Sequence, residues 1–366
     1  MKVHEKYMAR CIQLAKNGLG TTYPNPLVGC VLVHNNAIIG EGYHYKSGLP
    51  HAEVNAVQNT IKAFEKKELT TAQQEQLFKE ATCYVSLEPC SHFGKTPPCA
   101  DLLIAKGIKK VVVGSTDPNP KVAGRGIKKL MEAGCEVVIG VLEDACNDLN
   151  KRFFTFQNNK RPYIILKWAQ TQDGFIAPVE QNEIAPVWIS NQNSLQRAHK
   201  LRAEEQAILV GTTTVLKDNP SLTARHWKGD SPTRIILDRT LKIATNHTIY
   251  DGKEDTIIIT EKVAENRENI KFIKTSFVDS LAENICKILY NQNIQSVIIE
   301  GGTKTIQTFI NENLWDEALV FQGSKNFQQG VEAPQLEMAQ ISEKNPDSTR
   351  DKNDTLIYYK NSAPAC

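Results

Sequence analysis

The sequence predicts two consecutive α/β domains. Its 366 residues are long for one domain and sufficient to bury two separate cores. In both halves, short apolar runs of strand character alternate with helical patterns, which is typical of sheets that contain parallel strand pairs. A polar stretch over 147–162, with no clear hydrophobic period, separates the two halves. We therefore expect one domain over 1–147 and a second domain over 160–366.

The first expected element is a helix over 4–17, in which apolar residues recur at helical spacing until Gly18 and Gly20 end the run. Two strands over 28–33 and 37–42 then flank a short polar turn and predict a hairpin. The elements expected after the hairpin are, in order, a helix over 52–64, an exposed helical insertion over 65–81, a strand over 83–87, a helix over 99–106, a strand over 111–115, a helix over 125–133 and a strand over 136–141.

The second half restarts with the apolar run YIILKWA at 163–169, which predicts a buried strand. A helix near 191–204 follows, with Ser190 as its expected N-cap. The elements expected after it are strands over 207–211, 233–238 and 255–260, a helix over 278–290, a strand over 296–300, a helix from about 303, and strands over 317–323 and 354–359.

Composition and charge argue against several classes of protein. The 43 basic and 41 acidic residues give a net charge of +2, which is too balanced to favour long nucleic acids. Apolar runs such as VGCVLV (28–33) are too short to cross a bilayer, and charges interrupt the N-terminus where a signal peptide would be apolar. Nine cysteines, an odd number, favour a reducing compartment over a disulfide framework. We expect a cytoplasmic protein with no nucleic-acid or membrane partner.

Four residues form the pattern of a catalytic zinc site. His51 and Glu53 stand at the start of a predicted helix, Cys90 follows a predicted strand, and Cys99 follows two prolines at the start of another helix. Helix N-termini favour the thiolate over the thiol, and the thiolate is the form that binds metal. Three protein ligands, His51, Cys90 and Cys99, leave the fourth tetrahedral position to water, as in catalytic rather than structural sites.

Glu53 is the expected proton carrier of this site. Two thiolates cancel the charge of the zinc ion, so the metal acidifies its water less than in a site of three histidines. A carboxylate two residues from the ligand His51 can accept the proton and pass it to a leaving amine. Zinc nucleobase deaminases use such a carboxylate, although their two cysteines are closer in sequence. A structural zinc site with His92 or Cys83 as fourth ligand is the alternative.

Five blocks of the first half carry a further signal: PNPLVGCVLV (24–33), GEGYH (40–44), HAEVNA (51–56), YVSLEPCSHFGKTPPC (84–99) and DPNPKVAGRGI (117–127). Together they resemble the bifunctional deaminase/reductase family of riboflavin biosynthesis. The resemblance implies a cytidine-deaminase-like, three-layer fold for the first domain. It also implies hydrolytic removal of the 2-amino group of a diaminopyrimidinone that carries a ribosylamino 5′-phosphate. The substrate contacts implied in this domain are Asn25, His44, His92 and Lys95.

The resemblance continues through the second half in the blocks WIS (188–190), LRA (201–203) and TVLKDNPSLTAR (214–225). It implies a dihydrofolate-reductase-like domain that uses NADPH. A Rossmann site is not indicated, because no G-x-G-x-x-G fingerprint follows a strand. The residues implied to bind NADPH are Ala169, Trp188, Thr214, Asp218, Gly302, Thr303, Lys304 and Thr305. The residues implied to bind the substrate are Lys167, Arg202, Leu222, Arg225 and Glu300.

Three features depart from the family pattern. Pro186 stands where the family usually has a serine two residues before the tryptophan, and proline offers neither a hydroxyl nor an N–H. The loop over 177–187 is also longer than usual. Arg239 stands where a small residue is common, so it either reaches the adenosine phosphate of the cofactor or points to solvent.

The expected function is therefore a bifunctional enzyme with zinc and NADPH as cofactors, which deaminates first, reduces second and forms a homodimer. A deaminase whose second domain is impaired in reduction is the alternative. A nucleic-acid deaminase would need a basic patch and cysteines two residues apart, and the sequence has neither. A non-catalytic zinc module would have no use for Glu53.

Overall fold

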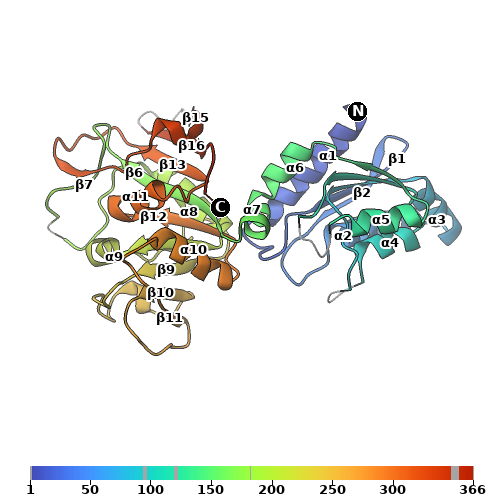
Figure 1. Cartoon of the computed structure of the whole chain (residues 1–366). Coiled ribbons are helices and arrows are strands. Elements are labelled where there is room, and N and C mark those ends of the chain that lie inside the picture. The colour runs from blue at the N-terminus through green and yellow to red at the C-terminus, as the bar shows by residue number, and fades with distance from the viewer. Residues whose placement is uncertain (1, 94–96, 119–122, 182, 348–353, 366) are drawn as a thin grey trace. The chain divides into compact units, whose positions relative to one another are not determined.

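The computed structural model describes residues 2–93, 97–118, 123–181, 183–347 and 354–365 (Figure 1). The chain divides into two compact units, Met1–Asn158 and Asn159–Cys366. This division falls at the end of helix α7 (Lys151–Asn159), inside the polar stretch over 147–162 that we expected to separate the two halves. The helix buries only Phe153 and Phe156, and so short an apolar face gave no clear period among its polar neighbours.

The first unit is built around a five-stranded sheet of order β2-β1-β3-β4-β5. Its elements are α1 (Lys2–Ala15), η1 (Lys16–Gly18), β1 (Gly29–His34), β2 (Ala37–Tyr43), α2 (Ala52–Glu65), α3 (Thr71–Glu80), β3 (Thr82–Leu87), α4 (Cys99–Ala105), β4 (Lys110–Ser115), α5 (Arg125–Glu132), β5 (Glu136–Ile139), α6 (Glu143–Leu149) and α7. Strand β1 runs antiparallel to β2 and β3, whereas β3, β4 and β5 are parallel. The expected hairpin and the expected mixture of pairings are therefore present.

Helices cover both faces of this sheet. Along β1, Cys30 and Leu32 enter one core together with apolar residues of α2 and α4. Val31 and Val33 enter a second core together with apolar residues of α1 and α6. This alternation is the period-two pattern of a strand buried on both faces. The expected three-layer α/β architecture of the first half is confirmed.

Two glycines allow α2 to lie close against β2. A Cβ atom on Gly40 would stand 2.8 Å from the carbonyl oxygen of Ala56, and one on Gly42 would stand 2.6 Å from the Ala56 nitrogen. Any larger residue would push the helix away from the sheet. The close contact fixes the N-terminal end of α2, where His51 and Glu53 lie.

The second unit is built around a nine-stranded sheet of order β11-β10-β9-β8-β12-β6-β13-β16-β15. Its elements are β6 (Tyr163–Gln170), β7 (Phe175–Pro178), α8 (Gln192–Glu204), β8 (Ala207–Gly211), α9 (Thr212–Asp218), β9 (Thr233–Leu237), η2 (Thr248–Tyr250), β10 (Thr256–Thr260), β11 (Ile270–Lys274), α10 (Leu281–Asn291), β12 (Ser296–Glu300), α11 (Thr303–Asn311), β13 (Glu317–Gln322), β14 (Gly330–Glu332), η3 (Met338–Gln340), β15 (Ile341–Asp347) and β16 (Thr355–Asn361). In this order, each neighbouring pair between β11 and β13 is parallel, whereas β16 pairs antiparallel with β13 and with β15.

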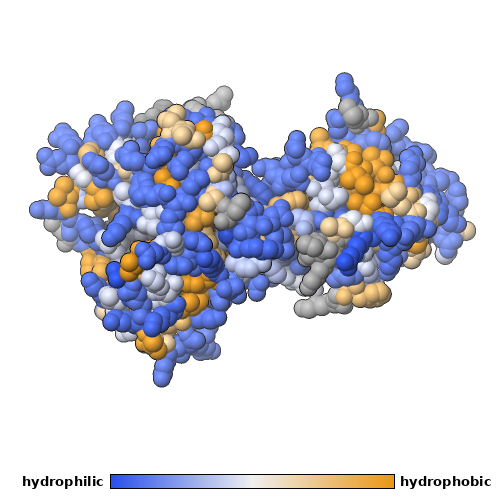
Figure 2. Space-filling model, viewed as in Figure 1, coloured by the Kyte–Doolittle hydropathy of each residue, from blue (hydrophilic) through white to orange (hydrophobic). Residues whose placement is uncertain are grey.

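Both faces of this sheet are also buried. Along β12, Val297 and Ile299 enter a core with apolar residues of α10 and α11, whereas Ile298 enters a core with Val215 of α9. Strands β7 and β14 form a separate two-stranded sheet. Hydrophilic residues cover most of the surface visible in Figure 2, and apolar residues form separate patches on it.

The structure corrects several expectations about elements. Helix α8 is capped by Asn191, not Ser190, because the Asn191 side chain accepts hydrogen bonds from the N–H groups of Asn193 and Ser194. Helices α6, α7 and α9 and strands β7, β11, β14 and β15 were not expected. Thr212–Asp218, which forms α9, begins with three threonines, and β-branched residues are weak helix formers.

The region expected to be a helical insertion does contain a helix, α3. Thr70 caps it in a capping box with Gln73. Within the described ranges, no helix is long and apolar enough to span a membrane.

Candidate active sites

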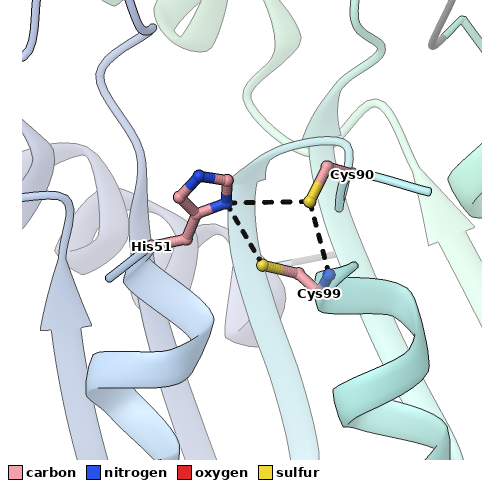
Figure 3. Close-up of side chains that lie close together, drawn as sticks. All are labelled: His51, Cys90 and Cys99. Carbon is pink, nitrogen blue, oxygen red and sulfur yellow. Dashed lines mark hydrogen bonds between the residues drawn. The ribbon is translucent and has the colours of Figure 1, made fainter. Parts of the chain in front are cut away.

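Three side chains of the first unit converge on one point (Figure 3). His51 immediately precedes α2, Cys90 lies shortly after β3, and Cys99 is the first residue of α4. The His51 Nδ1 atom lies 3.6 Å from Cys90 Sγ and 3.4 Å from Cys99 Sγ. Ligand atoms bound tetrahedrally at zinc distances of about 2.0–2.3 Å stand about 3.5 Å apart. The three residues therefore fit a zinc ion.

Hydrogen bonds within this group favour the thiolate form of Cys90. The side chain of Cys99 is hydrogen-bonded to Cys90 and, with His51, lowers the pKa of the Cys90 thiol to about 4. The backbone N–H of Cys99, at the N-terminus of α4, also donates to Cys90 Sγ at 3.3 Å. In turn, the hydrogen bond to Cys90 raises the pKa of His51. A negative sulfur at a helix N-terminus is the state that a metal ligand needs.

Glu53 lies in the first turn of α2 and is 3% exposed. Burial raises the pKa of its carboxyl to about 7, and the nearby Cys90 adds to this shift. The Glu53 side chain also contacts Cys99, so it lies beside the group that fits a metal. A carboxyl with a pKa near neutrality can both accept and donate a proton.

The alternative of a structural zinc site is not supported. Among the described residues, the group that could hold a metal has three members, His51, Cys90 and Cys99. Cys83 is directed elsewhere, because its Sγ atom lies 3.6 Å from that of Cys30. His92 is exposed. An open fourth position is the pattern of a catalytic site.

Two of the residues predicted to contact the substrate lie beside His51. The Asn25 Nδ2 atom donates to His44 Nε2 at 3.1 Å, and His44 Nδ1 donates to the Pro50 carbonyl at 3.1 Å. The His44 ring meets the His51 ring edge-on with the centroids 5.4 Å apart. Burial lowers the pKa of His44, which favours its neutral form. The predicted residue Lys95 lies outside the described residues.

Glu88 is a residue of this site that sequence analysis missed. Its two carboxylate oxygens accept the backbone N–H groups of Asp117, Gly124, Gly126 and Ile127 at 2.9–3.3 Å. Glu88 is 5% exposed and stands two residues before Cys90. It therefore ties the loop that carries Cys90 to the N-terminus of α5. The sequence places Glu88 beside the motif, but its partners lie more than 25 residues away.

The second unit contains a cavity of about 540 Å³. Most of the residues predicted to bind NADPH or substrate in this unit line it, namely Lys167, Ala169, Trp188, Arg202, Thr214, Asp218, Leu222, Arg225, Glu300 and Gly302. They come from β6, α8, α9, β12 and the loops between these elements. The structure thus brings together residues that are up to 135 positions apart in the sequence.

Glu300 forms ion pairs with two cations of this cavity. It accepts Lys167 Nζ at 2.8 Å and Arg202 Nη2 at 2.9 Å. Burial alone would raise the pKa of Glu300, but the charges and hydrogen bonds of Arg202 and Lys167 outweigh it and lower the pKa to about 2. Glu300 is therefore ionised at neutral pH and orients both cations. Burial and the charge of Arg202 lower the pKa of Arg225, which also lines the cavity.

Three predicted cofactor residues do not line the cavity. Thr303, Lys304 and Thr305 form the first turn of α11, directly after the lining residue Gly302. The Thr303 hydroxyl donates to the Glu332 carbonyl. The N-terminus of α11 nevertheless follows the end of β12, where Glu300 lies, after only Gly301 and Gly302.

The three departures from the family pattern fall in two different places. Pro186 lines the cavity, together with Gln181 of the same loop. Arg239 does not, because its Nε atom donates to Glu261 at 2.8 Å and its side chain is 54% exposed. The Arg239 side chain therefore lies at the surface, where it pairs with Glu261.

The fold and the two sites define a bifunctional enzyme in which a zinc-binding deaminase domain precedes a reductase domain. Residues 1–115 match the cytidine and deoxycytidylate deaminase zinc-binding region, and residues 162–340 match the RibD C-terminal domain. The chain belongs to the RibD family of riboflavin biosynthesis proteins. It is 40% identical to RibD of Aquifex aeolicus over 93% of both chains, and 34% identical to RibD of Escherichia coli over 94% of this chain and 97% of that one.

Solved structures agree with this assignment. The deaminase/reductase of Thermotoga maritima, whose full description is diaminohydroxyphosphoribosylaminopyrimidine deaminase/5-amino-6-(5-phosphoribosylamino)uracil reductase, superimposes with a TM-score of 0.85 at 36% identity. That match covers 98% of this chain and 99% of the other. RibD of Acinetobacter baumannii gives a TM-score of 0.84 at 32% identity, over 99% of both chains. The predicted cytidine-deaminase-like and dihydrofolate-reductase-like folds are confirmed, and nothing in these matches supports a chain that only deaminates.

Proposed function

We propose that this chain catalyses two successive reactions on a phosphorylated pyrimidine. The first is the hydrolytic deamination of 2,5-diamino-6-ribosylamino-4(3H)-pyrimidinone 5′-phosphate. The second is the reduction of its ribosyl group to ribityl by NADPH. The observation that carries the proposal is the convergence of His51, Cys90 and Cys99 beside the buried carboxyl of Glu53. Membership of the RibD family supports the choice of substrate.

For the deamination, we assign three zinc ligands and one proton carrier. His51, Cys90 and Cys99 hold zinc, which supplies an acidified water when it is bound. Glu53 would take a proton from the attacking water and pass it to the leaving amine, so that a new bond from the ring carbon to oxygen replaces its bond to nitrogen and the amine departs as ammonia. Asn25 and His44 hold the pyrimidine, and His92 and Lys95 bind the substrate from the loop between the two cysteines.

For the reduction, the cavity of the second unit holds cofactor and substrate side by side. We assign NADPH to Ala169, Trp188, Thr214, Asp218 and the segment Gly302–Thr305, where glycine and a helix N-terminus suit a phosphate. We assign the substrate to Lys167, Arg202, Leu222, Arg225 and Glu300. NADPH supplies the hydride, and the protein positions the ribose carbon that receives it. Arginine suits the 5′-phosphate because its planar fork binds two phosphate oxygens at once.

Three further expectations belong to the same proposal. We assign deamination to a domain over 1–147 and reduction to a domain over 160–366. A cytoplasmic location is supported by the eight cysteines of the described residues, all of which are free thiols, as expected in a reducing compartment. A homodimer stays a prediction, which light scattering of the purified protein would test.

An assay of both half-reactions tests the proposed function. Purified enzyme is given the phosphorylated diaminopyrimidine and NADPH, and ammonia and NADPH oxidation are recorded with and without a metal chelator. Zinc should be present in the purified enzyme, and the chelator should stop ammonia release. NADPH oxidation with the already deaminated substrate should continue in chelator. Equal loss of both activities would contradict the division of labour between the two units.

Arg225→Ala separates the two reactions in a second way. The variant should lower the rate of reduction, because it removes a cation from the cavity, and should leave deamination unchanged. Arg267→Ala is the matched control, because Arg267 is an exposed arginine of the same unit that does not line the cavity. An equal loss of reduction in both variants would contradict the assignment of Arg225 to the substrate.

A further inference from the structure

His199 is a buried imidazole in the wall of the reductase cavity. It lies on α8, one helical turn before Arg202, and lines the cavity with Arg202 and Arg225. Its side chain is 0% exposed, and neither ring nitrogen has a hydrogen-bond partner among the described residues. The Thr223 backbone interacts with the ring closely enough to raise its pKa, although the strict geometry of a hydrogen bond is not met. Since buried polar groups are nearly always paired, this imidazole calls for a partner that is not part of the chain.

The surroundings of His199 are cationic. Arg202 faces it from its own helix, and Arg225 and His226 face it from the segment after α9. The nearby carboxylate, Glu300 of β12, is already shared between Arg202 and Lys167 of β6. Arg225 has no carboxylate partner in the described part of the chain, and its Nη1 atom lies 3.5 Å from the Thr223 hydroxyl. The cavity therefore presents more positive charge at this end than its own residues neutralise.

We propose that His199 forms an anion-binding group with Arg202 and Arg225, and that its ring takes up a proton when a phosphate monoester dianion binds there. The inference deepens the reductase part of the proposed function, and it rests on that function for the identity of the ligand. His199 lies outside the sequence blocks 188–190, 201–203 and 214–225, and it adds a third group to the two arginines assigned above.

Coulomb's law explains why binding of an anion should favour protonation of His199. Burial, and then the charges of Arg202 and Arg225, lower the pKa of His199 to about 4, so the ring is neutral in the free protein at pH 7. A dianion between the arginines replaces repulsion by attraction and favours the imidazolium form. Both ring nitrogens would then donate hydrogen bonds, one of them to the anion. The exposed ring of His226 meets His199 edge-on at 4.7 Å and covers it from the outside.

Calorimetry with sulfate tests this proposal on the full-length, zinc-loaded protein. Sulfate remains a dianion between pH 6 and 8, so every proton taken up belongs to the protein, whereas a phosphate monoester with a pKa of about 6 would itself titrate. Binding heats are compared at each pH in buffers that differ in ionisation enthalpy. We expect proton uptake that approaches one proton per sulfate toward pH 6 and declines toward pH 8. The affinity should then rise by up to about tenfold per pH unit as the pH falls.

Three variants assign the proton. His199→Gln should bind sulfate more weakly and without proton uptake, whereas His226→Gln, the neighbouring histidine, should retain the uptake. Arg225→Ala should abolish the coupled binding, which separates this cavity from any anion site in the first unit. The proposal is overturned if the wild-type protein binds sulfate without proton uptake or fails to bind it. It is also overturned if the uptake survives in His199→Gln or Arg225→Ala, or is lost in His226→Gln.

The result is independent of the assay of reduction. Sulfate binding with proton uptake at His199, in a protein that does not oxidise NADPH, would keep this inference and contradict the proposed reductase activity. NADPH oxidation without sulfate-linked proton uptake would keep the proposed reductase activity and contradict this inference. If His199→Gln does not fold, the wild-type measurement still tests the proposal, because the absence of proton uptake by the wild-type protein already refutes it.

Discussion

At the scale of single residues, Glu53 combines burial with contact to the metal-binding sulfurs, and this combination suits a group that moves protons. Glu53→Gln keeps the size of the side chain but removes its ability to take a proton. We expect ammonia release to fall by about 10²–10⁴-fold, the usual contribution of general acid–base catalysis. Zinc content, measured by atomic absorption, should not change, because Glu53 is not among the proposed ligands. Glu65→Gln, at the exposed end of the same helix, is the control and should behave as the wild type.

The low pKa of Glu300 predicts how the stability of the second unit depends on pH. Its pKa is lowered to about 2 in the folded protein, from an ordinary value of 4.5. A depressed pKa contributes stability that is present above the ordinary value and is lost as the pH falls toward the folded value. The free energy of unfolding of the wild-type second unit should therefore exceed that of Glu300→Gln at pH 6. This difference should shrink between pH 4.5 and 3, by at most about 1.4 kcal/mol per pH unit.

Urea unfolding followed by tryptophan fluorescence measures this difference, since all four tryptophans of the chain lie in the second unit. Glu265→Gln is the control, because Glu265 is an exposed carboxylate of the same unit that does not line the cavity. A difference that stays constant from pH 6 to 3 would show that Arg202 and Lys167 do not hold Glu300 ionised.

The sequence predicted the metal group because its signal is local. His51 and Cys99 stand at the starts of helices and Cys90 follows a strand, all within motifs of fixed spacing, and the structure brings the three together. The roles of Glu88 and His199 could not be predicted in this way. Glu88 accepts N–H groups of the backbone, which any residue provides, and His199 is notable only because it has no partner. Such properties depend on the folded surroundings rather than on residue type.

At the scale of elements, the loop that carries Cys90 is held to the start of α5 by Glu88. One Glu88 oxygen accepts the N–H groups of Gly126 and Ile127, and the other accepts those of Gly124 and Asp117. Gly126 allows this contact, because a Cβ atom there would stand 1.9 Å from the Pro89 carbonyl oxygen. The carboxylate thus acts as a clamp between the metal-binding loop and a helix N-terminus, where negative charge is also favourable.

Glu88→Gln should weaken the binding of zinc. The amide group would bring a donor against two backbone donors, so one pair of hydrogen bonds would be lost. Changes to groups that orient metal ligands usually lower metal affinity by about 10–100-fold. Competition with a chromogenic chelator measures this affinity. Glu132→Gln, at the exposed far end of α5, should leave it unchanged. Equal zinc affinity of Glu88→Gln and the wild type would mean that the clamp does not support Cys90.

The elements that were predicted correctly are those with long apolar runs. Val, Ile and Leu make up at least half of strands β4, β8, β10 and β12, because both faces of these strands are buried. The elements that were missed have no such signal. Strand β14 has three residues, β7 has four, and α7 buries only two aromatic side chains. Their conformation depends on what they pack against, and a sequence pattern cannot show this.

At the scale of the whole molecule, each unit has its own hydrophobic cores. The first unit contains cores around Leu32 and Val31, and the second contains cores around Ile299 and Ile298. The proposed ligands are divided in the same way, with zinc in the first unit and NADPH in the second. Because a ligand stabilises only the unit that binds it, the two units should respond to different ligands on heating.

Thermal unfolding of the intact chain tests this independence, because tryptophan fluorescence reports the second unit alone, whereas circular dichroism reports both. NADPH at 100 times its dissociation constant should stabilise the second unit by about 2.7 kcal/mol and raise the fluorescence midpoint. A zinc chelator should leave that midpoint in place and should lower the midpoint of a second transition, seen only by circular dichroism. If the chelator lowered the fluorescence midpoint as well, the cores would be coupled, and loss of metal would reach the reductase cavity through the protein itself.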